Sequence, residues 1–183
     1  MKTKFILNGG FTKGKSDEDN SQFYSEILKD VPEGAKVLLV CFAKENDRIS
    51  DATTKVMAEF NKNKSQNKVN FEVANEQSFL EQIKSSEVIY LHGGRTIKLL
   101  EALKKFPNLK DLLNGKVIAG ESAGANVLCQ FFYSPTTDHI GEGLGFLPVK
   151  IIPHYSKEYE GKLDSVGSDL ELLLLPEYQF KVF

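Results

Sequence analysis

The chain has 183 residues, of which 41% are hydrophobic, so it is long enough to bury a core, and we expect residues 1–183 to form a single domain. The formal net charge of -2 and the lack of a dense Lys/Arg cluster argue against a nucleic-acid-binding protein. No apolar stretch approaches the length of a membrane span, and residues 1–20 lack the apolar core of a signal peptide, which predicts a cytoplasmic protein with no membrane partner.

Strand-like apolar runs alternate with amphipathic, helix-like segments through the first part of the chain. The expected strands are residues 4–8, 36–43, 69–73, 87–91 and 116–119. The expected helices are residues 19–28, 50–61, 76–85 and 97–105, with Ser50 as the N-cap of the second. Because such alternation is typical of βαβ units, we predict an α/β three-layer sandwich whose helices cover both faces of a mostly parallel sheet.

The remaining elements are a helix, two strands and several loops. We expect a helix over 125–130, strands over 149–153 and 170–175, and loops over 134–139, 141–148 and 156–168. The leucine-rich last strand is expected to be fully buried. Both cysteines, Cys41 and Cys129, lie in apolar runs, with Cys129 on the expected helix, and this predicts buried reduced thiols. We expect no metal and no cofactor.

The stretch Gly120-Glu-Ser-Ala-Gly124 joins an expected strand to an expected helix and has the spacing of a nucleophile elbow. Small residues two positions before and after the serine let the backbone turn tightly without Cβ clashes. Ser122 would then stand at the carboxyl end of the strand as a nucleophile, with the Ala123 amide free to bind an oxyanion. A serine N-cap on a glycine-rich turn is the structural alternative.

A second glycine-rich turn, Gly93-Gly94, also follows an expected strand. The carboxyl ends of parallel strands share one edge of the sheet, and ligands bind there. An amide of this turn is therefore placed to supply a second oxyanion donor. The residues alone fit a simple left-handed turn equally well.

A serine nucleophile needs a general base, and histidine is the usual one because its pKa lies near 7. Of the three histidines, His154 is favoured because it ends an expected strand, which would hold it on the catalytic edge. His139 lies on an expected loop and is the second choice. His92 lies beside the glycine pair.

The third member of a triad orients the imidazole and stabilises its charged form. Asp138 and Glu142 precede His154 in the chain, whereas Glu177 follows it. Glu177 comes directly after an expected strand, which would bring it to the same edge as His154. This placement favours Glu177 by a small margin, and spacing alone leaves all three acids open.

Five segments of the chain, taken together and in this order, carry a resemblance to a known family. They are His92–Thr96, Gly120–Ala125, Gly143–Leu147, Pro153–Tyr155 and Leu175–Glu177. The chain resembles the S51 serine peptidases, the family of aspartyl dipeptidase (peptidase E) and cyanophycinase, whose flavodoxin-like fold is related to that of class I glutamine amidotransferases. The resemblance implies a triad of Ser122, His154 and Glu177, with backbone donors from Gly93, Gly94 and Ala123.

The resemblance also implies a substrate-binding acid in the loop after the elbow, and Asp138 is its best match, with a role in holding the substrate's α-ammonium. Arg95 stands where the family usually has asparagine. Because its planar guanidinium suits carboxylates, we expect Arg95 to contact a carboxylate of the substrate. A side chain that points into solvent or pairs with a nearby acid such as Glu101 fits the residues equally well.

The predicted function is a serine-type exopeptidase or dipeptidase that cleaves short peptides, aspartyl peptides among them, through an acyl-enzyme. One alternative is a small-ester or amide hydrolase with a triad of Ser122, Asp138 and His154. The other is a non-catalytic binding member of the fold. The expected partner is a small peptide substrate, with no nucleic acid; a homodimer is compatible with the sequence, which neither requires nor excludes one.

Overall fold

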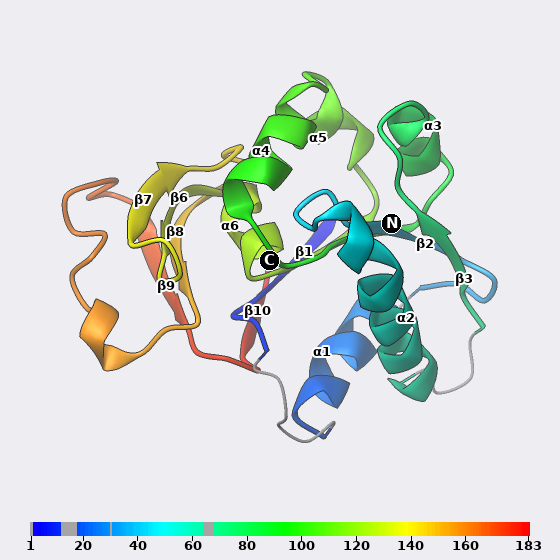
Figure 1. The fold of residues 1–183 in the computed structure, drawn as a ribbon, viewed down its shortest axis with the longest axis horizontal. Helices are drawn as coiled ribbons and strands as arrows, with labels where there is room; N and C mark the ends of the chain where they lie inside the picture. The colour runs from blue at the N-terminus through cyan, green and yellow to red at the C-terminus, as the bar shows by residue number, and fades with distance from the viewer. Residues whose placement is uncertain (1, 12–17, 30, 64–67) are drawn as a thin grey trace.

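The computed structural model describes residues 2–11, 18–29, 31–63 and 68–183. Six strands form the main sheet, in the order β10-β1-β5-β4-β2-β3 (Figure 1). They are β1 (Lys4–Asn8), β2 (Lys36–Val40), β3 (Asn70–Val73), β4 (Val88–Leu91), β5 (Val117–Glu121) and β10 (Phe180–Val182). All neighbouring strands are parallel except β10, which runs antiparallel to β1. The predicted mostly parallel α/β sheet is therefore confirmed.

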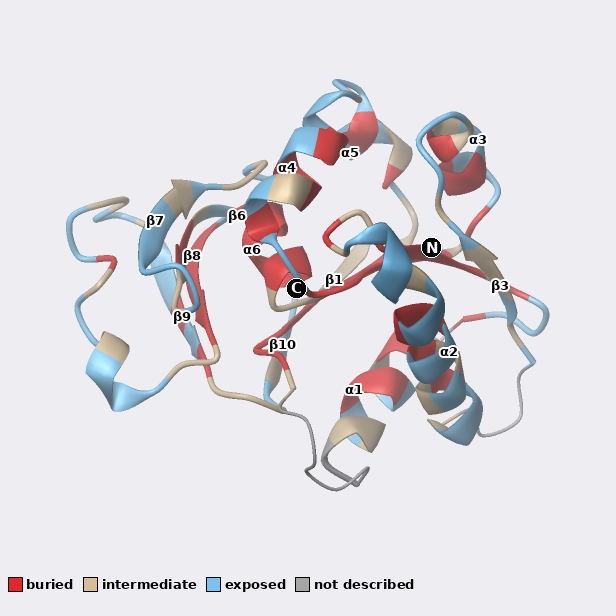
Figure 2. Ribbon diagram, in the orientation of Figure 1, coloured by how far each residue is buried: buried red, intermediate tan, exposed pale blue. Residues whose placement is uncertain are grey.

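Helices cover both faces of this sheet, as its apolar strands require. They are α1 (Glu18–Leu28), α2 (Asn46–Asn63), α3 (Phe79–Lys84), α4 (Thr96–Lys104), α5 (Leu109–Leu112) and α6 (Ala123–Leu128). Neighbouring strand residues serve opposite faces, since Ile6 packs with Phe23 of α1 whereas Leu7 packs with Leu99 of α4. Figure 2 shows the resulting buried strands between exposed outer helix faces.

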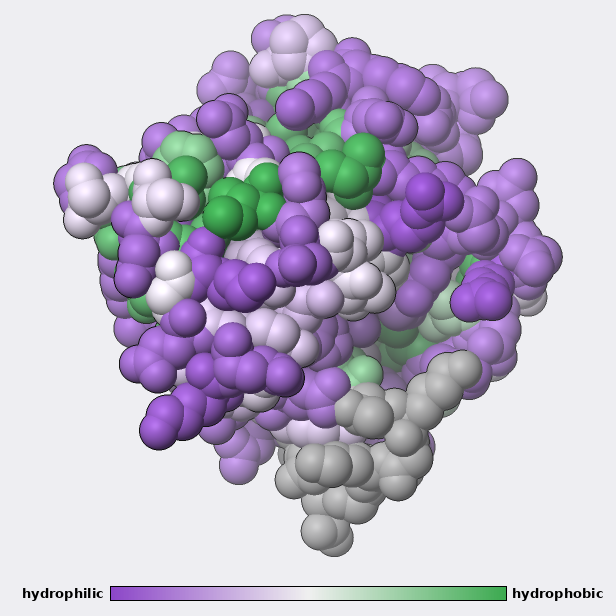
Figure 3. Space-filling model, turned by 60° about the vertical axis from the view of Figure 1, so that its left-hand side comes forward, coloured by the Kyte–Doolittle hydropathy of each residue, from purple (hydrophilic) through white to green (hydrophobic). Residues whose placement is uncertain are grey.

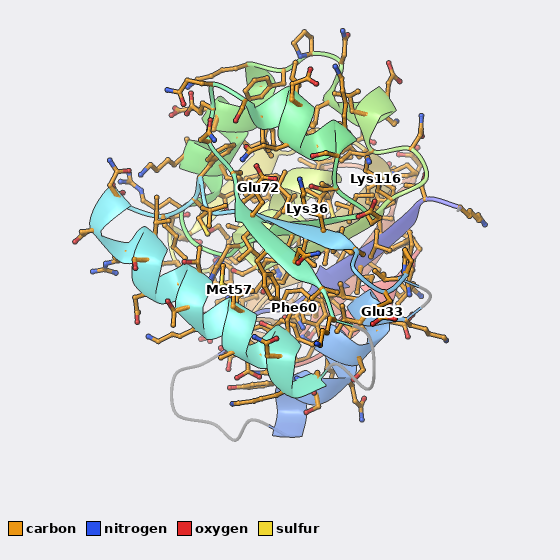
Figure 4. The ribbon with its side chains drawn as sticks, turned by 90° about the vertical axis from the view of Figure 1, so that its right-hand side faces the viewer. Glu33, Lys36, Met57, Phe60, Glu72 and Lys116 are labelled. Carbon is orange, nitrogen blue, oxygen red and sulfur yellow. The ribbon has the colours of Figure 1, made fainter. Side chains whose placement is uncertain are left out.

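Helix α2 packs against β3, the strand at one edge of the main sheet. Phe60 of α2 is fully buried and its ring lies 5.7 Å from that of Phe71 on β3. On the neighbouring strands, Lys36 and Glu72 form an ion pair of 3.0 Å (Figure 4). Burial of the aromatic ring stabilises this edge more than the ion pair does, because the pair is about one-third exposed and screened by solvent.

A second sheet, which the sequence analysis did not anticipate, lies across α6 from the main sheet (Figure 1). Its order is β7-β6-β8-β9, with β6 (Cys129–Ser134), β7 (His139–Glu142), β8 (Leu147–Pro153) and β9 (Glu171–Leu175). A short 3-10 helix, Lys157–Tyr159, lies between β8 and β9. Every residue of α6 is buried, because this helix packs against a sheet on each side.

Several predicted boundaries were wrong. The second helix begins at Asn46, so Ser50 is not its N-cap but an interior residue whose carbonyl accepts a hydrogen bond from the Thr54 hydroxyl (2.8 Å). β2 ends at Val40, earlier than expected. The helix expected over 125–130 ends at Leu128, and Cys129 begins a strand instead.

The predictions of loops over 134–139 and 141–148 were also partly wrong. Strands β6 and β7 form an antiparallel hairpin there, with Ser134 opposite His139. Both strands are short and lack a clear alternation of buried and exposed residues, and each forms through pairing with its neighbours, β7 with β6 and β6 with β8.

The expectation that β9 is fully buried was wrong as well. Leu173 and Leu175 are buried, whereas Leu172 and Leu174 are each 36% exposed. The connection between β8 and β9, Leu163 among its residues, covers the side of β8 that faces away from α6, whereas the outward side chains of β9 meet solvent. Figure 3 shows hydrophobic patches among mostly hydrophilic residues on the side of the molecule that carries this sheet.

Candidate active site

Ser122 stands on a tight turn between β5 and α6, with φ of 50° and ψ of -104°. A positive φ is strained for a residue with a side chain, and such strain collects at functional sites. The turn requires glycine at the two flanking positions. A Cβ on Gly124 would lie 2.1 Å from the Leu91 carbonyl oxygen, and one on Gly120 would lie 2.5 Å from the Gly124 carbonyl oxygen. The turn leaves Ser122 half-buried at the carboxyl end of β5.

His154 directly follows β8 and lies against Ser122. Its Nε2 is 2.9 Å from Ser122 Oγ, a hydrogen-bond distance. The backbone fixes this residue in place, since its amide donates to the Gly9 carbonyl (2.7 Å) and its φ is 51°. The imidazole is therefore held by the junction between the main sheet and the second sheet.

Glu177 lies on the other side of the imidazole. Its Oε1 is 3.0 Å from His154 Nδ1, and each side chain is 30% exposed. Strands β8 and β9 are parallel neighbours with Pro153 opposite Leu175, so the residues that follow both strands reach the same edge. A carboxylate at Nδ1 selects the tautomer in which Nδ1–H donates to Glu177 and Nε2 accepts from the Ser122 hydroxyl.

The three expected oxyanion donors lie on adjacent segments. β4 and β5 are parallel with Leu91 opposite Gly120, so the Gly93-Gly94 turn comes beside the elbow. The φ of Gly94 is 150°, and a Cβ there would lie 2.5 Å from the Ala43 carbonyl oxygen, so only glycine fits. Within the described part of the chain, the amides of Gly93, Gly94 and Ala123 donate to no acceptor. They remain available to an oxyanion.

The two expected substrate-binding residues lie apart. Arg95 is the N-cap residue of α4, and its side chain is 77% exposed, with Nη1 3.4 Å from Glu45 Oε1. Asp138 lies at the tip of the β6–β7 hairpin and accepts hydrogen bonds from the Tyr133 hydroxyl (2.7 Å) and the Lys162 ammonium (2.9 Å). These hydrogen bonds lower the pKa of Asp138, and the one from Lys162 contributes most. Asp138 is not the acid that contacts His154.

The other histidines and the third acid lie elsewhere. His139 and Glu142 are exposed residues of β7. His92 is buried, and its imidazole Nδ1 lies 3.4 Å from Glu121 Oε2 without the geometry of a hydrogen bond. Burial lowers the pKa of His92, which keeps this imidazole neutral at neutral pH.

Three residues of the site, Asn8, Gly9 and Gly10, were missed by the sequence analysis, which gave Asn8 only as the end of an expected strand and assigned no role to the two glycines. The Asn8 carbonyl accepts the Ser122 amide (3.0 Å), and its side-chain oxygen accepts the Gly10 amide (2.7 Å). A Cβ on Gly9 would lie 2.1 Å from the Pro176 carbonyl oxygen. The signal was the glycine pair itself, since two glycines directly after a buried strand indicate close approach of another segment.

Gly10 is expected to be essential to the position of the imidazole. Its φ is 105°, and a Cβ would lie 2.2 Å from His154 Cε1. Gly10→Ala should therefore displace the ring and lower kcat/KM by about 100-fold or more, because small misplacements of reacting groups cost rates of this order. Steady-state kinetics with a cleaved dipeptide would measure the loss.

Gly34→Ala is the matched control, because Gly34 also has a positive φ (79°) but no atom lies within 4 Å of its added Cβ. It should lower stability by about 1 kcal/mol through backbone strain and leave kcat/KM unchanged. Equal kinetic losses in the two variants would contradict a specific role for Gly10.

A large cavity opens beside the elbow, on the side of the main sheet covered by α1 and α2. Its volume is about 960 Å³. We call it the side cavity; its lining includes Phe11, Tyr24, Lys44, Glu45, Arg48, Asp51, Lys55, Glu59, His92, Gly94, Arg95, Glu121 and Thr136. Glu121, the residue before Ser122, was also missed as a site residue. Its Oε2 accepts a hydrogen bond from the Tyr90 hydroxyl (2.7 Å).

Among residues 2–11, 18–29, 31–63 and 68–183, no group of three or more His, Cys, Asp or Glu side chains is arranged to hold a metal ion. Both cysteines are free and buried, and burial raises the pKa of Cys41 to about 11. None of the helices described above combines the length and the apolar composition needed to cross a membrane.

The sequence model of Peptidase family S51 matches residues 5–168. The chain belongs to peptidase family S51. The match includes the elbow, the Gly93-Gly94 turn and His154, and it ends before Glu177.

Two curated relatives of this S51 family member are named Peptidase E. That of a Nostoc species is 34% identical over 89 residues, which covers 44% of this chain and 37% of the relative. That of Salmonella arizonae is 34% identical over 86 residues, with 42% and 38% covered. The alignments therefore span less than two-fifths of the relatives' length.

Two solved structures share the fold over the whole chain. A peptidase from an acI-B1 Actinobacterium has a TM-score of 0.71 at 21% identity, with 100% of this chain and 84% of the other covered. A putative Peptidase E protein from Listeria monocytogenes EGD-e has a TM-score of 0.65 at 15% identity, with 100% and 98% covered. At these identities the likeness concerns the fold alone.

Proposed function

We propose that this S51 family member is a serine exopeptidase that cleaves short peptides through an acyl-enzyme. The observation that carries the proposal is the unbroken hydrogen-bonded chain from Ser122 Oγ through the His154 imidazole to Glu177, at 2.9 and 3.0 Å. Activation of a serine hydroxyl requires a base in contact with it and a group that orients that base. Membership of the family and the Peptidase E relatives support the same reaction.

In the proposed reaction, Ser122 Oγ attacks the carbonyl carbon of the scissile amide while His154 Nε2 takes the hydroxyl proton. The carbonyl oxygen becomes negatively charged and is bound by the free amides of the Gly93-Gly94 turn and Ala123. The imidazolium then gives its proton to the leaving nitrogen, and the C–N bond breaks. Water, deprotonated by His154, attacks the resulting ester and releases the acid and Ser122. Glu177 stabilises the imidazolium throughout.

A fluorophosphonate probe tests this proposal directly, because it forms a covalent bond with an activated serine. We expect labelling of the wild-type protein, with the adduct mapped to Ser122 by mass spectrometry. A panel of dipeptides that vary in their first residue would then define the substrate. Absence of labelling, together with no cleavage of the panel, would support the non-catalytic binding alternative.

Arg95 is proposed to contact a substrate carboxylate. It lies on the wall of the side cavity, and its only ion-pair partner in the described residues, Glu45, is 52% exposed and also pairs with Lys98 at 3.0 Å. Such a loosely held guanidinium is able to exchange Glu45 for a ligand.

Arg95→Asn should raise KM for a free-acid dipeptide and leave KM for its C-terminal amide unchanged. Equal effects on acid and amide would remove Arg95 from recognition.

A further inference from the structure

The side cavity carries four acidic side chains, and they differ in their partners. Three of them form an ion pair with a lysine: Glu45 with Lys98 at 3.0 Å, Asp51 with Lys55 at 2.6 Å and Glu59 with Lys62 at 3.0 Å. The fourth is Glu121, whose polar contacts within the described part of the chain are with Tyr90 and His92.

Neither of those two contacts neutralises the Glu121 carboxylate. Burial, and then the charge of Glu121 itself, raises the pKa of Tyr90, so its hydroxyl stays protonated and donates a neutral hydrogen bond. His92 stays neutral because burial lowers the pKa of its imidazole. The Glu121 side chain is only 13% exposed. A carboxylate so enclosed without a cation is costly unless a ligand supplies the missing positive charge.

The second oxygen of this carboxylate accepts no hydrogen bond in the described residues and lies beside the Gly93-Gly94 turn. No donor in the described residues bonds to Glu121 Oε1, and this atom would be 3.0 Å from a Cβ built on Gly93. Glu121 therefore borders both the side cavity and the turn that carries the oxyanion donors. In a peptide cleaved after its first residue, the α-ammonium is attached to the carbon next to the scissile carbonyl. A carboxylate beside the oxyanion donors is thus within reach of that ammonium.

We infer that Glu121 binds the free α-ammonium of the substrate and restricts cleavage to peptides with an unblocked first residue. This inference rests on the proposed exopeptidase function. The cations Lys44, Arg48 and Arg95 on the same cavity wall suit the opposite charge of a zwitterionic peptide. Asp138, the acid that the family resemblance had suggested for the ammonium, is already bound to Lys162 and is not part of the cavity lining.

The test compares peptides that differ only in the amino group: Ala-Leu with propionyl-Leu, and Asp-Leu with succinyl-Leu. Within the pair that is cleaved faster, the wild-type protein should cleave the peptide with the free amino group with a much higher kcat/KM than its des-amino analogue. Glu121→Gln keeps the shape and an acceptor for the Tyr90 hydroxyl but removes the charge. The variant should lower the ratio of kcat/KM for the amine to kcat/KM for the des-amino peptide by about 10- to 100-fold, which is the contribution of one charged hydrogen bond. The change should come mainly from a higher KM for the amine.

Asp138→Asn is the matched control, because it makes the same chemical change at an acid outside the side cavity. It should leave the ratio unchanged. A ratio that falls in Asp138→Asn and not in Glu121→Gln would overturn the inference. If Glu121→Gln does not fold, a wild-type ratio near one would still overturn the inference, because it is incompatible with an ammonium site.

The proposed function and this inference fail in different ways. A wild-type protein that reacts with the fluorophosphonate probe but cleaves no dipeptide contradicts the exopeptidase function itself. A protein that cleaves amine and des-amino peptides equally well is an active hydrolase in which Glu121 does not bind the ammonium.

Discussion

Replacing Ser122 with alanine should abolish hydrolysis, with a loss of about 10⁶-fold in kcat, as expected for the nucleophile of a triad. The loss follows from the 2.9 Å contact with His154, since no other hydroxyl is placed there by the turn. The fold should persist, because Ala and Ser carry the same strain at a φ of 50° and the neighbouring glycines, which make the turn fit, are unchanged. Dipeptide cleavage and thermal unfolding would be measured on the same preparation.

Ser156→Ala is the matched control for this variant. Ser156 is an exposed serine near His154 whose hydroxyl bonds to Glu158 (2.8 Å). Its removal should change neither cleavage nor fluorophosphonate labelling. A Ser122→Ala protein with activity within tenfold of wild type would refute the assignment of the nucleophile.

The second large effect is expected at the acid of the triad. Glu177→Gln should lower kcat by about 10⁴-fold, because an amide cannot stabilise the imidazolium and can hold His154 in the wrong tautomer. Asp138→Asn should cause a far smaller loss, since Asp138 bonds to Tyr133 and Lys162 rather than to His154. The measurement is kcat for the best dipeptide in both variants.

This comparison also tests the small-ester hydrolase alternative, which uses Asp138 as the acid. If Asp138→Asn removes kcat and Glu177→Gln is mild, the hydrogen bond between His154 and Glu177 is not part of catalysis. The order of the triad along the chain would then be Ser, acid, His.

Much of the fold could be predicted because its signals are local. Five strands of the main sheet were predicted close to their observed positions, since four are apolar runs and β3 alternates apolar with polar residues. Two strands of the second sheet were predicted as well, over 149–153 and 170–175, and correspond to β8 and β9. Its other two strands, β6 and β7, were not predicted. β7 has only one large apolar residue, Ile140, and becomes a strand through pairing with β6. β10 is three residues long and exists as a strand through its pairing with β1.

The side cavity had no local signal of its own, and the glycine pair that includes Gly10 did not show which segment approaches it. The cavity brings together residues of α1, α2 and the ends of β4 and β5, which are far apart in the sequence. Gly10 meets the His154 ring across 144 residues of chain (154 − 10). A sequence read residue by residue reports a flexible turn at such a position, because the reason for the glycine lies in another segment.

The sequence by itself determined the alternating α/β architecture and the tight strand-to-helix turn at Ser122, because hydrophobic periodicity and the steric demand of glycine act over a few neighbouring residues. Only the tertiary structure decided which acid contacts His154. Asp138, Glu142 and Glu177 are chemically equivalent carboxylates, and spacing along the chain did not separate them. The parallel register that sets Pro153 opposite Leu175 brings Glu177 to the imidazole, and Lys162 holds Asp138 elsewhere. Strand register is a property of the packed sheets, fixed by which side chains each strand buries.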